Sequence, residues 1–288
     1  MRREILLAGT FVVATAAALG GQSAQSPQQF ADAMTREHAH DAPVANASAR
    51  APRQQVRTQE VVYDTVNGQP VRGFIAWPAR GGRFPAVLMI HEWWGLNDNV
   101  KQMAQRLAGE GYRVLAVDLY GGRVASTPQE AGTYMREVTN NTGRAVSNLR
   151  SAAEFLKTRQ RAAKVGVVGW CFGGAWALQS ALIMPEHVDA TVMYYGRPVT
   201  DRDRLANLDA PLLGLFGAAD RSIPVEQVRE MESALKELGK PVEVHVYEGA
   251  AHAFANPSGQ AYKAEAADDA WNRTLAFFGQ HLRAPGQR

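Results

Sequence analysis

Apolar and polar positions follow one another in blocks along the chain, and these blocks predict alternating strands and helices. Short apolar runs that end at glycine, proline or aspartate are typical of buried parallel strands, whereas longer runs with one apolar face are typical of helices. Predicted strands cover residues 60–66, 71–78, 84–90, 112–117, 165–170, 188–195, 211–216 and 242–247, and predicted helical regions cover 98–110, 128–159, 224–238 and 262–282. Asn67-Gly68 predicts a hairpin between the first two strands. The alternation favours an α/β fold with a mostly parallel central sheet and helices on both faces.

One predicted strand-to-helix junction carries the single cysteine of the chain. The apolar run Val165–Trp170 leads into Gly169-Trp170-Cys171-Phe172-Gly173, and a helical pattern opens at Ala175. A nucleophile between two glycines, on a sharp turn between a strand and a helix, is the nucleophile elbow of the α/β-hydrolase fold. The N-terminus of the following helix favours the thiolate. The alternative for Cys171 is an inert buried thiol.

Two further residues follow predicted strands in the order that this fold requires. Asp220 comes just after the strand at 211–216, and His252 comes just after the strand at 242–247. The order nucleophile, acid, histidine matches Cys171, Asp220 and His252. His252 would take the thiol proton, and Asp220 would orient the ring and stabilise its charged form. Taken singly, Asp220 is equally typical of a turn and His252 of a loop.

Acyl transfer also requires hydrogen-bond donors for the oxyanion that forms on the substrate. In this fold one donor is the backbone N–H that follows the nucleophile, and the other lies in the loop after an early strand. The sequence therefore predicts the N–H groups of Phe172 and Trp93, the latter in the loop His91-Glu92-Trp93-Trp94-Gly95.

Several of these motifs together resemble the dienelactone hydrolase family. The resemblance covers about Val61 to Leu282, and its motifs are His91-Glu92-Trp93-Trp94-Gly95-Leu96, Asp118-Leu119-Tyr120, Gly169-Trp170-Cys171-Phe172-Gly173-Gly174, Tyr194-Tyr195-Gly196, the Asp220 segment and His252-Ala253-Phe254. It implies hydrolysis of a lactone or ester through a thioester on Cys171. It also implies that Glu92 contacts the resting thiol and gates its activation.

The resemblance further implies two arginines that hold a substrate carboxylate. Arg123 lies one position late for the first, and Asn256 stands where the second is expected. A carboxylate held by a single arginine loses a charge-assisted contact. We expect Arg123 and Tyr195 to contact the substrate, and we expect small esters or lactones with little preference for an anion. A true dienelactone hydrolase and a non-catalytic binding protein on the same fold are the alternatives.

The composition fits one domain with a sizeable core. The chain has 288 residues, 46% of them hydrophobic, and a formal net charge of +3 without a basic run. This charge is typical of a solvated surface and not of a nucleic-acid-binding face. A single cysteine excludes an intramolecular disulfide. Because the histidines are scattered, we expect no metal. We also expect no cofactor, a small-molecule substrate as the partner, and a monomer.

The N-terminal 24 residues resemble a signal peptide. Met1-Arg2-Arg3 supplies positive charge, Ile5–Leu19 is apolar, and Gly20–Ala24 is a region of small residues suited to cleavage. We expect a cleaved leader and export to the bacterial periplasm, with an uncleaved anchor as the alternative.

The next segment, residues 25–55, is rich in Ala, Gln, Ser and Pro and predicts a flexible linker. His38 and His40 lie close together within it, and a solvated linker is favoured over a weak metal site there. The folded domain is predicted to span residues 56–288.

Overall fold

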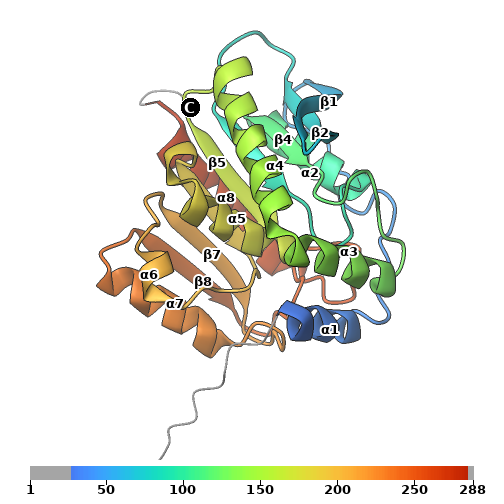
Figure 1. Cartoon of the computed structure of the whole chain (residues 1–288), viewed down its shortest axis with the longest axis vertical. Helices are drawn as coiled ribbons and strands as arrows, with labels where there is room; N and C mark the ends of the chain where they lie inside the picture. Colours follow the sequence, from blue (N-terminus) through green and yellow to red (C-terminus); the bar gives the residue numbers. More distant parts are fainter. Residues whose placement is uncertain (1–26, 285–288) are drawn as a thin grey trace, which may run out of the picture.

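A sheet of eight strands forms the centre of the described part of the chain (Figure 1). The structure is a computed structural model, and it describes residues 27–284. The strands are β1 (Val56–Val66), β2 (Gln69–Pro78), β3 (Ala86–Ile90), β4 (Arg113–Val117), β5 (Val165–Trp170), β6 (Ala190–Tyr194), β7 (Leu212–Gly217) and β8 (Val242–Tyr247). Their order is β1-β2-β4-β3-β5-β6-β7-β8. β1 and β2 pair antiparallel with their neighbours, whereas all pairs from β4 to β8 are parallel.

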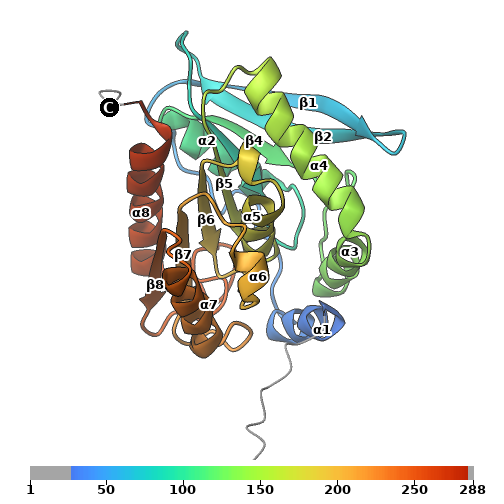
Figure 2. The same cartoon turned by 60° about the vertical axis from the view of Figure 1, so that its left-hand side comes forward.

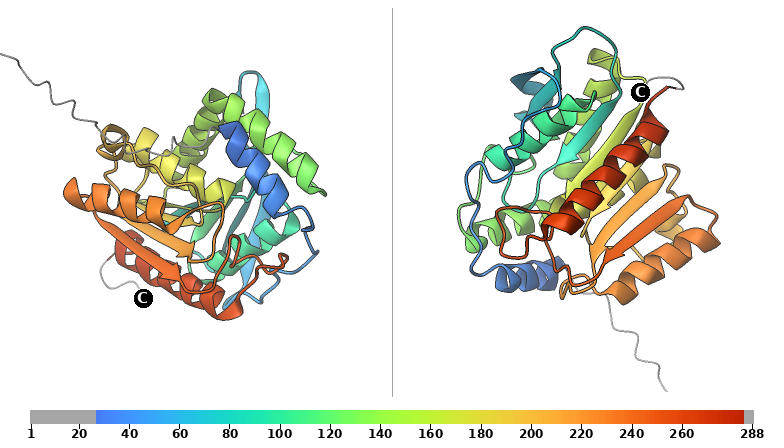
Figure 3. Two further views of the ribbon diagram at one scale, coloured as in Figure 1. Left: turned by 90° about the horizontal axis from the view of Figure 1, so that it is seen from below. Right: turned by 180° about the vertical axis from the view of Figure 1, so that it is seen from behind.

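Helices cover both faces of this sheet. The helices are α1 (Pro27–Glu37), α2 (Asp98–Gly109), α3 (Pro128–Asn140), α4 (Thr142–Glu154), α5 (Phe172–Ile183), α6 (Arg202–Leu205), α7 (Val225–Glu237) and α8 (Ala264–Leu282). Figures 1 and 2 show α4, α5 and α7 on one face, and the right-hand view of Figure 3 shows α8 crossing the other. The predicted α/β-hydrolase architecture is thus confirmed.

Buried side chains explain why these elements form. Every residue of β3 and β5 is buried, as expected for central parallel strands covered on both faces. Helix α5 lies against β5 and is buried along most of its length, so it is apolar on almost every side. Helix α3 begins with a capping box between Thr127 and Glu130, which satisfies backbone N–H groups of its first turn.

Most of the predicted elements are present within a few residues. The hairpin at Asn67-Gly68 is confirmed, with positive φ at both residues and Val66 paired to Gln69. The long helical region predicted over 128–159 is divided into α3 and α4 at Asn141, whose φ of −127° departs from helical geometry. A π-helical turn, Phe155–Arg159, continues α4. The short helix α6 was not predicted.

The segment after residue 26 differs from the flexible linker that we expected. Helix α1 packs against α3, and it buries Phe30, Ala31 and Met34. Apolar residues three and four positions apart share one face of a helix, so this short apolar stripe can dock on the domain. Compositional bias towards Ala, Gln and Ser masked the stripe. The predicted signal peptide lies outside the described residues.

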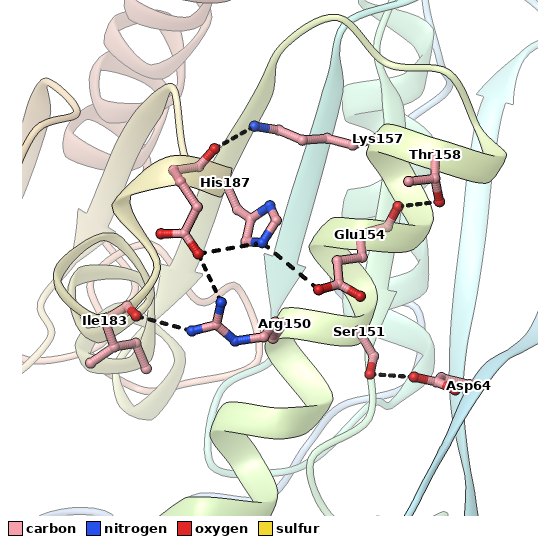
Figure 4. A network of polar contacts seen from close by, with 9 residues as sticks. Asp64, Arg150, Ser151, Glu154, Lys157, Thr158, Ile183 and His187 are labelled. Carbon is pink, nitrogen blue, oxygen red and sulfur yellow. Dashed lines mark hydrogen bonds and ion pairs between the residues drawn. The ribbon is translucent and has the colours of Figure 1, made fainter.

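A charged network ties α4 to the far end of α5 (Figure 4). Arg150 donates to a Glu186 carboxylate oxygen at 2.7 Å and to the Ile183 carbonyl at 3.2 Å, and Lys157 donates to the Glu186 carbonyl at 2.8 Å. These contacts hold α4 beside the C-terminus of α5, whose N-terminus carries Cys171. Within residues 27–284, no helix is long and apolar enough to cross a membrane.

Candidate active site

The junction between β5 and α5 has the geometry of a nucleophile elbow. Cys171 has φ 54° and ψ −116°, a strained conformation for a residue with a side chain, at a cost of about 1–3 kcal/mol. A Cβ at Gly169 would meet the Gly173 carbonyl oxygen at 2.1 Å, and one at Gly173 would meet the Ile90 carbonyl oxygen at 2.3 Å. The glycines therefore permit the turn that raises Cys171 above the sheet. Tyr195 and Ala253, also near this turn, have positive φ as well.

Asp220 and His252 form a fully buried pair at the same end of the sheet. The Asp220 Oδ2 atom lies 2.7 Å from His252 Nδ1, and both side chains are at most 1% exposed. The other carboxylate oxygen accepts from the backbone N–H groups of Ser222, at 2.9 Å, and Ile223, at 2.8 Å. The carboxylate is thus fixed in place by the turn after β7, and its free oxygen points at the imidazole.

The charged groups around His252 favour its protonated form. Burial by itself lowers the pKa of His252, but the charges of Cys171 and Asp220 raise this pKa well above its ordinary value. Cys171 and Asp220 are therefore both close enough to His252 to raise its pKa. His252 Nε2 is buried and makes no hydrogen bond within residues 27–284. A thiol beside an imidazole, with a carboxylate behind the ring, is an arrangement suited to nucleophilic attack on an acyl group.

The two residues predicted to donate to the oxyanion are both neighbours of Cys171, one along the chain and one across the cavity. Phe172 is the first residue of α5, so its N–H is one of the four that lack a partner within the helix. Trp93 follows β3 in a turn and lines the same cavity as Cys171. Its side chain is 2% exposed.

Glu92 is buried and is held by two polar side chains. The Tyr195 hydroxyl donates to Glu92 Oε1 at 3.1 Å, and the Asn256 amide donates to Oε2 at 2.6 Å. Burial raises the pKa of Glu92 to about 7, against smaller opposing effects from Tyr195, His252 and Asn256. Glu92 lines the cavity beside Cys171, but its hydrogen bonds go to Tyr195 and Asn256. Tyr195 therefore reaches the site through Glu92 and through its ring, which packs 5.2 Å from the His252 ring.

Arg123 is not brought to this cavity. Its guanidinium pairs with Glu137, and its Nε atom donates to the Tyr120 carbonyl at 3.0 Å. The guanidinium also lies 4.1 Å from the centre of the Tyr134 ring. The expectation that Arg123 contacts the substrate therefore lacks support in this structure, because Glu137 and Tyr134 hold the side chain away from the thiol.

Two residues of the N-terminal segment reach the site, and the sequence did not reveal them. Met34 Sδ lies 3.8 Å from Cys171 Sγ. The His38 ring packs 5.4 Å from the His252 ring and 5.1 Å from a Trp93 ring, and its Nδ1 atom lies 2.7 Å from Asp41 Oδ2. The apolar spacing of Phe30 and Met34 was the signal that could have found this contact. No metal-binding group of three or more His, Cys, Asp or Glu side chains occurs among residues 27–284.

A second hollow adjoins the cavity of the thiol. Glu92, Trp94 and Asn256 line both, and Trp170 and Met103 add apolar surface to the second hollow. Trp94 and Trp170 are thus placed to form an apolar wall near the site.

Comparisons with known proteins agree with the fold and show the family. The model of the dienelactone hydrolase family matches residues 71–282. Protein usf of Aquifex pyrophilus is 36% identical over 223 residues, covering 75% of this chain and 96% of that protein. A protein of Aquifex aeolicus provisionally named carboxymethylenebutenolidase is 34% identical over 224 residues, with 75% and 96% covered. The crystal structure of a protein of Klebsiella pneumoniae, provisionally named a dienelactone hydrolase, superimposes with a TM-score of 0.71 at 29% identity, covering 79% of this chain and all of that one.

Proposed function

Since this chain belongs to the dienelactone hydrolase family and is an ester or lactone hydrolase, we propose that it cleaves small esters or lactones through a thioester on Cys171. The observation that carries the proposal is the buried Asp220–His252 pair beside an elbow cysteine whose charge raises the pKa of His252. An imidazole held by a buried carboxylate is suited to take the proton of a neighbouring thiol.

The proposed reaction has two stages. The Cys171 thiol passes its proton to His252 as its sulfur attacks the carbonyl carbon. The electrons of the C=O bond move to oxygen, where the N–H groups of Phe172 and Trp93 donate to it. The tetrahedral adduct collapses to a thioester, and the departing alkoxide takes the proton from His252 Nε2. Water then attacks the thioester while His252 accepts its proton. The acid is released, and the departing sulfur recovers its proton from His252, which restores the resting enzyme.

The expected substrates follow from what lies around the sulfur. Trp94 and Trp170 offer apolar surface, whereas Arg123 is paired with Glu137 and Asn256 holds Glu92. Arg123 therefore offers no free guanidinium to a substrate carboxylate. A neutral ester or lactone fits this environment better than an anionic one.

The test is a hydrolysis screen of lactones and short-chain esters with the wild type, Cys171→Ala and Cys171→Ser. We expect an aryl ester to give a burst of phenol equal to the enzyme concentration in the wild type and none in Cys171→Ala. Cys171→Ser keeps a side chain of similar size and serves as the control for folding. Hydrolysis at the wild-type rate by Cys171→Ala would exclude the proposed nucleophile, and no hydrolysis by the wild type would favour a binding protein.

A true dienelactone hydrolase is the second candidate, because relatives carry the name carboxymethylenebutenolidase. The comparison of an anionic lactone with its neutral ester separates the two candidates. We expect kcat/KM values of similar size for both. A preference for the anion of about a hundredfold, or about 2.7 kcal/mol, would contradict the proposal and favour the second candidate.

We also propose that residues 1–24 direct export to the bacterial periplasm. The paired arginines, the apolar run and the small residues after it support this. The mass of the protein recovered from a periplasmic fraction tests it: loss of about 24 residues is expected, and an intact N-terminus in the membrane fraction would favour the anchor.

A further inference from the structure

Residues 27–41, which we name the roof, cover the thiol. Met34 is fully buried and its sulfur lies 3.8 Å from that of Cys171, which is itself 3% exposed. His38, 6% exposed, packs on the His252 ring and is fixed by Asp41 at 2.7 Å. The roof therefore contacts two of the three residues that we assign to catalysis. Figure 1 shows its helix, α1, at the end of the molecule next to α3.

The roof is docked by contacts on its other sides. Its helix lies so close to α3 that a Cβ at Gly132 would meet Thr35 Oγ1 at 2.5 Å. Asp32 pairs with Arg136 of α3 at 3.4 Å. At the end of the helix, Glu37 accepts a hydrogen bond from Ser222, two residues after Asp220. These noncovalent contacts hold α1 over the site.

The space left under the roof is too small for a substrate. The cavity that Cys171 shares with His38, Glu92 and Trp93 has a volume of about 10 Å³. A single water molecule needs about that much. Because Met34 Sδ lies 3.8 Å from Cys171 Sγ, an acyl group bonded to the sulfur would compete with the Met34 side chain for space. Methionine is unbranched and adaptable, so it can move aside for a small group at little cost.

We propose that Met34 determines which acyl groups reach Cys171, and that the roof shields the thiol in the resting protein. The inference rests on the proposed role of Cys171 as nucleophile. Small acyl groups are accommodated by rotation of the Met34 side chain, whereas larger ones require α1 to leave its seat. The same contact excludes reagents that would alkylate or oxidise the sulfur.

The shielding is measured by the alkylation rate of the single cysteine with iodoacetamide, followed by mass spectrometry. We expect Met34→Ala to react about tenfold faster than the wild type, because truncation exposes the sulfur. Met34→Leu keeps most of the volume and is expected to react within about twofold of the wild type. An unchanged rate in Met34→Ala would overturn the proposal.

A larger side chain between α1 and α3 tests whether the roof shields the thiol, and it leaves the residues of the site unchanged. Gly132→Leu adds a side chain where α1 approaches α3 most closely, whereas Gly143→Leu adds the same side chain on α4, where nothing lies within 4 Å. We expect Gly132→Leu to raise the alkylation rate about fivefold and Gly143→Leu to leave it unchanged. Equal rates in the two variants would contradict the roof. Circular dichroism and the thermal midpoint are the checks that both variants are folded, and this comparison remains decisive even where Met34→Ala folds poorly.

Acyl selectivity is measured as the ratio of kcat/KM for p-nitrophenyl octanoate to that for p-nitrophenyl acetate. We expect the ratio to rise about tenfold in Met34→Ala and to stay near the wild-type value in Met34→Leu. An unchanged ratio would overturn Met34 as the specificity residue. Hydrolysis that persists in Cys171→Ala would instead refute the proposed function, and the alkylation rates would still decide whether α1 shields the thiol.

Discussion

Two histidine–aspartate pairs lie side by side at one end of the molecule, and their internal geometry is nearly the same. His252 Nδ1 lies 2.7 Å from Asp220, and His38 Nδ1 lies 2.7 Å from Asp41. In both histidines the Nε2 atom is buried without a hydrogen-bond partner in the part of the chain that the structure describes. The two rings are 5.4 Å apart.

The surroundings of the two pairs differ. Asp220 is fully buried, and two backbone N–H groups of the turn after β7 fix its second oxygen. The side chain of Asp41 is 16% exposed and lies in the segment that follows α1. The charge of Cys171 raises the pKa of His252, whereas the His38 ring packs against the rings of Trp93 and His252. The distance between acid and imidazole therefore does not identify a catalytic pair; the group beyond Nε2 and the rigidity of the carboxylate do.

The largest contrast is expected from removal of each ring. His252→Ala should lower kcat for an aryl ester by about ten-thousandfold, because it removes the base and the acid of both stages. His38→Ala should lower kcat by less than about tenfold, since its ring does not transfer a proton in the proposed reaction. Steady-state kinetics of the two variants checks this. Equal losses would give both pairs a role in the chemistry.

Replacement of each carboxylate sharpens the same contrast. Asp220→Asn should lower kcat by about a thousandfold, because an amide no longer holds the required tautomer or stabilises the imidazolium. Asp41→Asn, the matched variant, should lower kcat by less than about threefold. The pH profile of kcat/KM distinguishes the two: its His252-dependent limb should move in Asp220→Asn and stay in Asp41→Asn.

The buried carboxyl group of Glu92 has a different pKa in the folded and in the unfolded chain. Its pKa is raised to about 7 in the folded protein, against an ordinary value of 4.5. The unfolded chain therefore releases this proton at lower pH than the folded chain, and Glu92 lowers the free energy of unfolding as pH rises from about 4.5 to 7. The side chain of Glu92→Gln stays neutral. When the pH is raised from 4 to 8, the free energy of unfolding of this variant should therefore rise by about 3 kcal/mol relative to that of the wild type.

Urea unfolding of wild type and Glu92→Gln at several pH values measures that gain. Glu137→Gln is the exposed control, because its carboxylate is half exposed and paired with Arg123. A difference between Glu92→Gln and wild type that does not change with pH would contradict the raised pKa.

The smallest effect is expected at Arg123, where the sequence suggested a substrate contact. Arg123→Ala should change kcat/KM for an anionic lactone by less than about twofold, because the guanidinium is already paired with Glu137 and packed on Tyr134. The ratio of anionic to neutral substrate is the measurement. A loss of about a hundredfold that is confined to the anion would show that Arg123 turns to the site when substrate binds.

The sequence alone determined the features that depend on local patterning. Apolar runs and their boundaries located all eight strands of the described sheet, and Gly169 and Gly173 marked the elbow at Cys171. The order of Cys171, Asp220 and His252 could be predicted because the strands of a parallel sheet all end at the same edge, so residues that follow them in sequence meet in space.

Only the tertiary structure decided which partners those residues have. Glu137 takes Arg123 away from the cavity, Tyr195 and Asn256 hold Glu92, and Met34 reaches Cys171 from 137 positions earlier in the chain. Such contacts join segments that are distant in sequence, and each is chosen by packing and charge among many side chains that the local pattern leaves equivalent. The apolar stripe of α1 was present in the sequence, but the surface on which it docks exists only once the chain has folded.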